Sequence, residues 1–491
     1  MRTADIPAGI LPGQRDLFYG GQWHPPVSGR YAETINPAYN EAIMSAAVAD
    51  ATDVDAAVRA AQAAFPGWAS TPPRKRGEYM RKAADALRVH AKELVLLDSL
   101  NNGNSVTALA HDVDFAIECL TYFSVLASEV KGETIPMGDG NLNFTVQEPL
   151  GVVARIVAYN HPFMFAASRL AAPLAAGNTV IIKAPDQSPL SLLRLAEIVG
   201  DIFPPGVVNF LSGAAECGQA LCQHPLVRKV TLIGGVPTGK AVMRAAADDL
   251  KPVLLELGGK NALIAYPDAD IDNLVDGIIG GMNFNWSGQS CGSTSRVFLH
   301  ESIHDSVLDQ VVAKLPERHR PGIPTDPNTT MGALVSQAQL DKVQGFVDSA
   351  LSQGARLMAG GKRPEDAALK DGFFYEPTVF ADVTPDMRLA REEVFGPILS
   401  VFRWSDEDEL FDIANGVDFG LTGSIWTRDV NRAIRAAKRI QTGYVWINNT
   451  GQHFLGAPFG GVKHSGIGRE ECFSEMLEFT YTKNVNVRLW P

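Results

Sequence analysis

The sequence is poor in cysteine, with only five among its 491 residues. They are Cys119, Cys217, Cys222, Cys291 and Cys472. None forms a CxxC pair or a Cys/His ligand cluster, so we expect no metal site and no disulfide framework. An odd number of cysteines fits a reducing compartment, which favours a cytoplasmic location.

Other absences exclude further classes of protein. The net charge is −12, and the lack of basic excess argues against a nucleic-acid partner, since binding the phosphate backbone needs a basic face. No run of 18 apolar residues occurs, so we expect no membrane-spanning segment or membrane partner. Residues 1–7 contain no apolar core of a secretory signal. No GxGxxG fingerprint of dinucleotide binding is present either.

The sequence is long enough, and apolar enough at 46%, to form more than one hydrophobic core. Helical spacing predicts helices over residues 50–65 and 74–100. From about residue 151, short apolar runs alternate with helical segments, which predicts an α/β fold with a mostly parallel sheet covered by helices on both faces. The predicted strands of this region are residues 152–157, 178–183, 207–211 and 229–233.

A second α/β region is expected from residue 261 to residue 460. Its strand candidates are residues 296–299, 397–402 and 444–447. Residues 144–147 and 484–487 form two extended segments outside both regions, able to pair with each other or with a partner chain.

Cys291 lies among small residues in the stretch NWSGQSCGSTSR, residues 285–296, where little shields its sulfur. It is a candidate nucleophile, and the alternative is a buried structural cysteine. Glu256 ends an apolar strand beside two glycines. Burial would raise the pKa of its carboxyl toward that of a general base; otherwise it is a helix-capping or salt-bridged glutamate.

Three further stretches carry candidate binding groups. Asn160 follows the strand at residues 152–157, where its amide is able to stabilise an oxyanion or simply to form a turn. Residues 392–397 hold an acid and an aromatic ring two positions apart. Residues 234–239 follow a strand and begin a helix. Their backbone amides either bind a pyrophosphate or belong to an ordinary strand–helix turn.

Together these stretches resemble the aldehyde dehydrogenase superfamily. ELGGK at residues 256–260 matches its glutamate motif, and GQSC at residues 288–291 its cysteine motif. Residues 159–162, 393–397 and 458–470 match further family segments, and the resemblance runs from about residue 17 to residue 487. It implies a Rossmann-like cofactor domain (residues 1–127 and 150–260), a catalytic domain (261–460) and a small β bridging element (128–149 and 475–491).

The resemblance also implies a reaction. Cys291 would attack an aldehyde to form a thiohemiacetal, whose oxyanion is held by the Asn160 amide and the Cys291 N–H. After hydride transfer, Glu256 would activate the water that hydrolyses the thioester to a carboxylate.

A nicotinamide cofactor is implied as well. Its expected contacts are Tyr159, Lys183, Asp186, Gly234, Gly235, Gly239, Leu257, Glu393 and Phe395. The turn at residues 232–235 reads LIGG where the family usually has Phe-Thr-Gly-Ser, which removes one hydroxyl contact to phosphate. Asp186 replaces the more frequent glutamate, and its carboxylate would repel a 2′-phosphate, so we expect NAD rather than NADP.

The substrate pocket departs from the family pattern. Its expected residues are Phe163, Phe165, Ser168, Arg169, Trp286, Ser290, Gly292 and Phe454. Ser168 replaces a bulky tryptophan, which favours a bulky, mostly apolar substrate such as an aromatic aldehyde, unless these rings only pack the core. Arg169 leaves open a semialdehyde bearing a carboxylate, which Arg binds bidentately. An amino-aldehyde dehydrogenase of the same family is a further alternative. Phe473 stands where some members carry an acid, which speaks against a Lys–Glu proton relay at Arg169.

Two other functions are weaker. CoA-acylating members typically lack the glutamate, so Glu256 weighs against that activity. A non-enzymatic role predicts loss of catalytic residues, yet Cys291, Asn160 and Glu256 are all present. The segments 144–147 and 484–487 resemble the family's bridging strands, which implies a homodimer or homotetramer.

Overall fold

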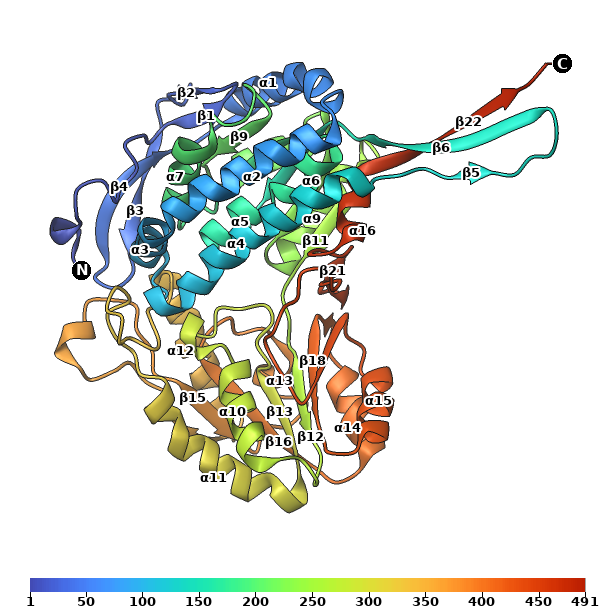
Figure 1. The fold of residues 1–491 in the computed structure, drawn as a ribbon. Helices are drawn as coiled ribbons and strands as arrows, with labels where there is room; N and C mark the ends of the chain where they lie inside the picture. Colours follow the sequence, from blue (N-terminus) through green and yellow to red (C-terminus); the bar gives the residue numbers. More distant parts are fainter. Residues whose placement is uncertain (491) are drawn as a thin grey trace.

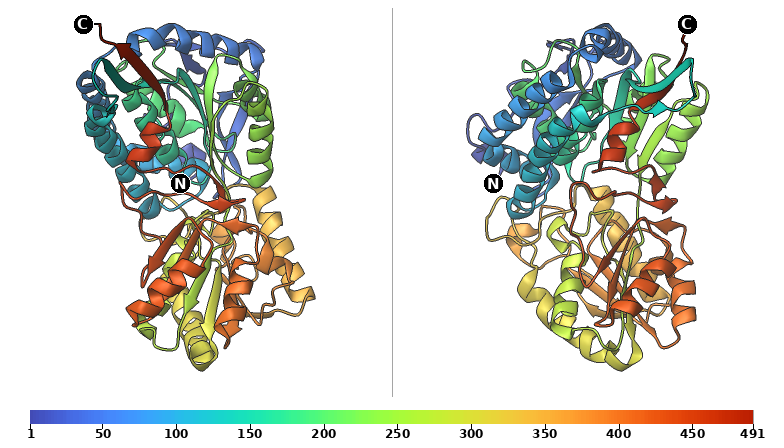
Figure 2. Two further views of the ribbon diagram at one scale, coloured as in Figure 1. Left: turned by 90° about the vertical axis from the view of Figure 1, so that its right-hand side faces the viewer. Right: turned by 45° about the vertical axis from the view of Figure 1, so that its right-hand side comes forward.

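The computed structural model describes residues 1–490, which form two lobes and a projecting β-ribbon (Figure 1). One lobe contains an eight-stranded sheet and the other a seven-stranded sheet. Two further views show the lobes stacked one above the other, with the C-terminal part of the chain passing between them (Figure 2). No helix within residues 1–490 combines the length and the apolar character needed to cross a membrane.

The first sheet has the strand order β2-β1-β9-β8-β7-β10-β11-β21. The bounds are β1 Leu17–Tyr19, β2 Gln22–His24, β7 Val152–Ile156, β8 Thr179–Lys183, β9 Val208–Leu211, β10 Val227–Ile233, β11 Val253–Glu256 and β21 Gly466–Ile467. The neighbouring strands β9, β8, β7, β10 and β11 are all parallel. From β7 the chain first adds β8 and β9 on one side, and it then crosses to add β10 and β11 on the other side, so the strand order reverses between β7 and β10. Ligands of such sheets bind outside the carboxyl ends of the strands at this point. All four strands predicted here are confirmed.

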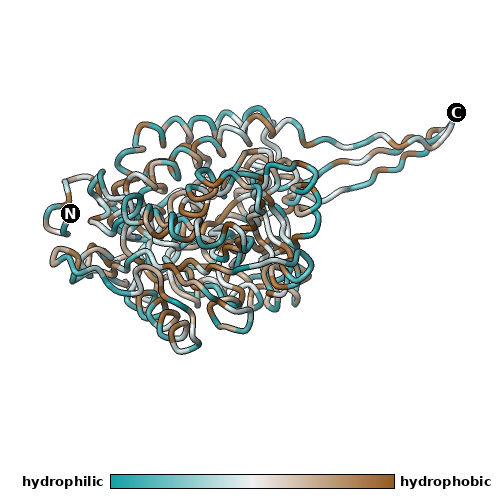
Figure 3. The backbone as a smooth tube through the Cα atoms, turned by 90° about the horizontal axis from the view of Figure 1, so that it is seen from below, coloured by the Kyte–Doolittle hydropathy of each residue, from teal (hydrophilic) through white to brown (hydrophobic). Residues whose placement is uncertain are grey.

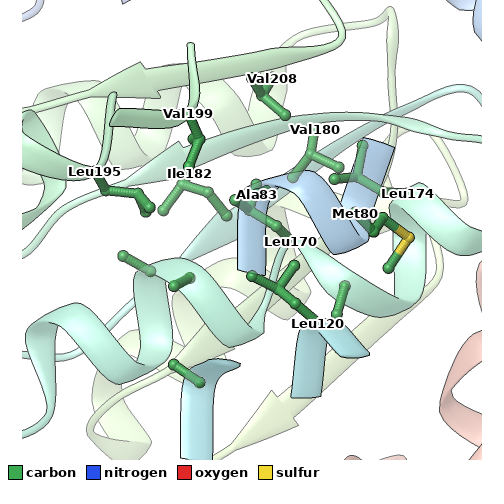
Figure 4. Close-up of a cluster of buried hydrophobic side chains, with 14 of the residues drawn as sticks. Met80, Ala83, Leu120, Leu170, Leu174, Val180, Ile182, Leu195, Val199 and Val208 are labelled. Atoms are coloured by element: carbon green, nitrogen blue, oxygen red, sulfur yellow. The ribbon is translucent and has the colours of Figure 1, made fainter. Parts of the chain in front are cut away.

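Helices cover both faces of this sheet because the strands alternate their side chains between two cores. Val180 and Ile182 of β8 face one core, and Ile181 faces the other. The first core packs α2, α4, α6 and α7 against β8 and β9 (Figure 4). The second packs α1, α8 and α9 on the opposite face. The bounds are α1 Ala51–Ala69, α2 Pro73–Val89, α3 Ala91–Asn102, α4 Val106–Leu126, α5 Pro162–Ser168, α6 Ala171–Ala176, α7 Leu190–Val199, α8 Ala215–Gln223 and α9 Val236–Ala247.

One helix prediction is wrong in part. Residues 74–100 form two helices, α2 and α3, separated at His90, whose backbone leaves the helical region with φ −96° and ψ 7°. The apolar spacing continues across this break because Leu87 and Leu94 pack into the same core. The predicted helix over residues 50–65 is confirmed as α1, which begins at Asp50 with a capping box closed by Asp53.

The second sheet has the order β14-β15-β16-β13-β12-β18-β19, and only β14 is antiparallel. The strands are β12 Ala262–Ala265, β13 Arg296–His300, β14 Arg356–Ala359, β15 Thr378–Ala381, β16 Ile398–Trp404, β18 Thr422–Trp426 and β19 Tyr444–Ile447. Its helices are α10 Ile271–Gly281, α11 Glu301–Arg318, α12 Gln337–Ser352, α13 Arg388–Arg391, α14 Glu407–Asn415 and α15 Val430–Arg439. The three strands predicted for this region are confirmed.

The ribbon consists of β5 (Thr134–Ile135), β6 (Asn141–Pro149) and β22 (Thr480–Arg488). β6 and β22 pair antiparallel along their whole length, so the two extended segments of the sequence pair with each other. The ribbon extends well away from the body, with apolar and polar residues interspersed along it (Figure 3). Just before β22, helix α16 (Phe473–Leu477) returns the chain to the first lobe.

The remaining pairs are small. They are the hairpin of β3 (Tyr31–Asn36) with β4 (Glu41–Ala47), and β17 (Phe419–Gly420) with β20 (Val462–Lys463). β21 joins β11, so residues from the C-terminal loop complete the first sheet next to Glu256. The division of the chain into cofactor and catalytic domains stays a prediction.

Candidate active site

Two cavities meet at Cys291 and Glu256, which line both of them. One, the strand-end cavity, has a volume of about 380 Å3 and is lined by residues that follow β7, β8, β10 and β11. The other, the aromatic cavity, has a volume of about 360 Å3 and is lined by Phe165, Trp286, Trp446 and Phe459 among others. A thiol and a carboxyl therefore stand where two separate ligands could approach each other.

The backbone of Cys291 is held by Asn261, which the sequence did not single out. The Asn261 Nδ2 donates to the carbonyls of Cys291 at 2.7 Å and Ser293 at 3.0 Å, and its Oδ1 accepts from the Thr422 N–H at 3.0 Å. Gly259 is equally constrained, since a Cβ there would lie 2.5 Å from the Cys291 carbonyl oxygen. These contacts fix the loop between the 3-10 turn Phe284–Trp286 and β13, so that the Cys291 side chain stays only partly exposed.

Glu256 ends β11 and is 3% exposed. Burial raises the pKa of its carboxyl to about 8, although a hydrogen bond with the Cys291 thiol works in the opposite direction. Burial and the nearby Glu256 charge raise the pKa of Cys291 well above the ordinary value for a thiol. The sulfur is therefore a thiol that needs a base, and the adjacent carboxyl becomes able to serve as one as the pH approaches about 8.

Asn160 lies in the segment after β7 and is 2% exposed. Its backbone carbonyl accepts from the Asn104 Nδ2 at 3.0 Å and the Asn102 Nδ2 at 3.4 Å. Its side chain lines the strand-end cavity together with Cys291. The structure thus brings Cys291, Glu256 and Asn160 to one place. Two further asparagines hold the backbone of Asn160.

The strand-end cavity gathers eight of the nine residues predicted to contact a cofactor. They are Tyr159, Lys183, Asp186, Gly234, Gly235, Leu257, Glu393 and Phe395. Gly239 does not line it; it lies on α9, where a Cβ would come within 2.7 Å of the Leu257 side chain. Gly239 thus packs closely against Leu257, and its contact with a cofactor stays a prediction. The sequence analysis missed Gln339 and Lys342 of α12, which complete the wall.

Glu393 is placed tightly within this cavity. Its Oε1 accepts from the Gly259 N–H at 2.8 Å, and a Cβ on Gly258 would lie 2.3 Å from its Oε2. Helix α9 begins at Gly235, so its N-terminus opens at the cavity, where anions are favoured. An anion-binding turn, a carboxylate at Asp186 and a second at Glu393 fit a dinucleotide with two riboses and a pyrophosphate.

The aromatic cavity contains five of the eight predicted pocket residues: Phe165, Arg169, Trp286, Ser290 and Gly292. The other three, Phe163, Ser168 and Phe454, do not line it and stay predictions. The Phe163 side chain of α5 is fully buried in the core, and the Ser168 hydroxyl donates to the Met164 carbonyl at 2.5 Å. Phe454 is 53% exposed at the surface.

Arg169 has an acidic partner although residue 473 is a phenylalanine, and the lack of a proton relay there stays a prediction. The Arg169 Nη2 lies 2.8 Å from the Glu470 Oε2, and both side chains are almost fully buried. Arg155 also binds Glu470 at 2.8 Å and Glu475 at 3.1 Å. The acidic partner comes from the loop before α16, whereas Phe473 is the first residue of that helix. Comparing only position 473 with the family therefore misses it.

Seven further residues line the aromatic cavity, and the sequence did not lead us to predict them as pocket residues. They are His111, Asp112, Met164, Trp446, His453, Phe459 and Glu471. They come from α4, α5, β19 and the loop 451–471, which only the fold brings together. His161 also lines this cavity; it lies in the segment 159–162 and directly follows Asn160.

The chain is similar to aldehyde dehydrogenases over nearly its whole length. The sequence model of the aldehyde dehydrogenase family matches residues 23–485. Aldehyde dehydrogenase tropH of Talaromyces stipitatus is 54% identical over 485 residues, covering 98% of this chain and 94% of that protein.

Solved structures agree. An aldehyde dehydrogenase from Bacillus cereus in complex with NAD+ superposes with a TM-score of 0.93 at 36% identity, covering 97% of each chain. Betaine aldehyde dehydrogenase from Staphylococcus aureus, also with NAD+, gives 0.94 at 33% identity, covering 97% of this chain and 96% of that one. With the thiol, the carboxyl and the two cavities in place, the chain belongs to the aldehyde dehydrogenase family.

Proposed function

We propose that the protein oxidises an aldehyde to a carboxylate with NAD as the hydride acceptor. The observation that carries this proposal is that Cys291 and Glu256 line both the strand-end cavity and the aromatic cavity. A nucleophile at that junction can hold the aldehyde from one side while the cofactor approaches from the other.

Three residues of the chain, Cys291, Glu256 and Asn160, carry out the proposed proton transfers, the nucleophilic attack and the stabilisation of the oxyanion. Glu256 accepts the Cys291 proton as the sulfur attacks the aldehyde carbon and forms a thiohemiacetal. The Asn160 amide and the Cys291 backbone N–H donate to the oxyanion, which is charge created only along the reaction. NAD, when bound, would supply the acceptor for the hydride, and loss of that hydride turns the Cys291 adduct into a thioester. Once Glu256 has released the Cys291 proton to solvent, it takes a proton from the water that hydrolyses this thioester to the carboxylic acid, and the departing Cys291 sulfur takes up a proton again.

The strand-end cavity supports NAD in preference to NADP. Asp186 contributes a carboxylate that accepts from ribose hydroxyls and repels a 2′-phosphate, and Lys183 lies beside it. Burial lowers the pKa of Lys183 from its ordinary value, while the nearby Asp186 works in the opposite direction. The similar Bacillus and Staphylococcus enzymes were both solved with NAD+.

The aromatic cavity supports a bulky, mostly apolar aldehyde. Phe165, Trp286, Trp446 and Phe459 supply its walls. The alternative, a semialdehyde whose carboxylate binds Arg169, is less well supported because Glu470 already pairs with that guanidinium. CoA-acylating activity is disfavoured by the buried Glu256 next to the sulfur.

We also propose that the ribbon joins subunits in a homodimer or homotetramer. β22 is an edge strand of its three-stranded sheet, so its outer backbone groups are free to pair with another chain.

A direct test combines turnover, product and variant. Purified protein with NAD and benzaldehyde should form NADH and benzoic acid, and CoA should not divert the product to a thioester. Cys291→Ala should lower turnover by at least ~10³-fold, because the covalent intermediate cannot form. Cys222→Ala, a buried cysteine that lines neither cavity, should keep it. Benzoyl-CoA as the main product, or full activity without Cys291, contradicts the proposal.

A further inference from the structure

The aromatic cavity contains two histidines that are each held by a buried carboxylate. The His161 Nδ1 lies 2.7 Å from the Asp112 Oδ2, and the His453 Nδ1 lies 3.0 Å from the Glu471 Oε2. Both carboxylate side chains are 5% exposed, while all four residues line the cavity. Nothing in the proposed mechanism uses either pair.

The geometry fixes which ring nitrogen carries the proton. Burial raises the pKa of Glu471, but His453 and Arg169 outweigh it and hold that pKa below its ordinary value. An ionised carboxylate only accepts hydrogen bonds, so the His453 Nδ1 must donate. In the neutral ring the Nε2 is then a bare acceptor. His161 contacts Asp112 through the same ring nitrogen, so its Nε2 is the atom left for a ligand.

Both Nε2 atoms are available to a ligand. Neither makes a hydrogen bond with any other residue in the range 1–490, and neither is among the polar atoms of that range sealed in the interior without a partner. The rings therefore present these atoms to open space, and the cavity is the space that they line.

The surroundings of the two rings are aromatic. The His161 ring lies 5.4 Å from that of Trp286 and 5.3 Å, edge to face, from that of Phe165. The His453 ring lies 4.4 Å from that of Phe459. A flat apolar ligand would thus meet aromatic walls together with a small number of directed acceptors, the usual composition of a specific small-molecule pocket.

We infer that the substrate is an aromatic aldehyde carrying a hydroxyl group that donates a hydrogen bond to the Nε2 of His161 or His453. This inference rests on the proposed function, because it assumes that the aldehyde enters the aromatic cavity. A carboxylate fits less well, since the one guanidinium lining the cavity, that of Arg169, is already paired with Glu470. A methyl ether fills similar space but cannot donate, so it separates recognition of the hydroxyl from simple packing.

The test compares matched aldehydes. We expect kcat/KM for 3- or 4-hydroxybenzaldehyde to exceed that of the methoxy analogue at the same position by at least about tenfold, chiefly through KM. His161→Phe and His453→Phe keep a ring but remove the acceptor, and one or both should abolish the preference. His90→Phe is the control: its Nδ1 pairs with the Glu93 carboxylate at 3.0 Å, outside the cavity.

A second pair of variants leaves both rings in place. In Asp112→Asn and Glu471→Gln the new amide is able to donate to Nδ1, which frees the ring to carry its proton on Nε2. We expect the preference for hydroxyl over methoxy to fall in at least one of them, and unchanged preference in both would overturn the inference. This comparison decides the matter even if a phenylalanine variant fails to fold.

The outcomes separate the two proposals. NADH formation with equal or better use of the methoxy aldehydes overturns the inference and leaves the proposed function standing. A preference that survives in the double variant His161→Phe, His453→Phe also overturns it, since the hydroxyl is then recognised elsewhere. If no aldehyde gives NADH, the proposed function fails, and calorimetric binding of the same aldehydes to Cys291→Ala still tests recognition. Equal affinity there for hydroxyl and methoxy forms overturns the inference.

Discussion

The two cavities that meet at Cys291 are built from different parts of the chain. The strand-end cavity uses short segments at the carboxyl ends of β7, β8, β10 and β11, where the sheet itself sets their positions. The aromatic cavity uses side chains from α4, α5, the 3-10 turn before Cys291 and the loop 451–471. One cavity lies mainly along the edge of a single sheet, and the other is formed by helices and loops that are far apart in the sequence.

This difference determines which substitutions each cavity tolerates. Glycines at 258 and 259 admit no Cβ, because Glu393 and the Cys291 carbonyl lie too close. The aromatic cavity has no comparable restriction, since its walls are rings and histidines that other side chains could replace. We therefore expect changes in the strand-end cavity to act on cofactor use and changes in the aromatic cavity to act on the choice of aldehyde.

Glu256 belongs to both cavities, so changing it should have the largest effect. Glu256→Gln keeps the shape but removes the base, and kcat should fall roughly 10²–10⁴-fold. In the unmodified protein, kcat should rise with pH through about 8 as the carboxyl loses its proton, because burial raises its pKa to that value. The steady-state pH profile measures this directly.

The variant should lose that rise altogether. Because we propose Glu256 as the base for both steps, acylation should slow as well as hydrolysis, and rapid mixing should show a slower first turnover of NADH. A variant that retains the original pH profile would show that another group is the base.

The sequence predicted the strand-end cavity far better than the aromatic one. Lys183, Gly234 and Glu256 end strands, and an alternating strand–helix pattern is enough to bring such residues to one edge of a sheet. His453 lies nearly 300 positions from His161 (453 − 161 = 292), and no local pattern connects them. The two histidines line one cavity because the C-terminal loop returns between the lobes. No residue in the loop predicts this long-range contact.

The fold shows the same contrast. The parallel strands have strong local signals because they are buried on both faces and therefore continuously apolar. The break at His90 went unpredicted because the helices on either side bury the same face, which preserves the period across it. Glu470 was missed as the partner of Arg169 because burial in an ion pair leaves no pattern in the sequence.

A second prediction separates the cavities by their glycines. In Gly258→Ala the new Cβ would lie 2.3 Å from Glu393 Oε2 and displace that carboxylate, which we propose binds a ribose. KM for NAD should rise about tenfold or more, as expected for the loss of a charge-assisted hydrogen bond. Initial rates at varied NAD measure the effect.

Gly292→Ala is the matched change on the other side. A Cβ at Gly292 meets only the Ser290 Oγ at 3.8 Å, so KM for NAD should stay the same. An equal rise in both variants would mean that the two cavities do not act separately.

The smallest effects should come from two phenylalanines on α5. Phe163 is fully buried in the core and Phe165 lines the aromatic cavity, although only one residue separates them. Phe163→Leu should lower the free energy of unfolding by about 1 kcal/mol and leave KM for the aldehyde unchanged, since only packing is lost. Phe165→Leu should raise that KM a few-fold, because it removes an aromatic wall and the edge contact to His161. Denaturant unfolding and aldehyde saturation curves measure the two quantities, and a larger KM change in Phe163→Leu would place the boundary between core and cavity elsewhere on this helix.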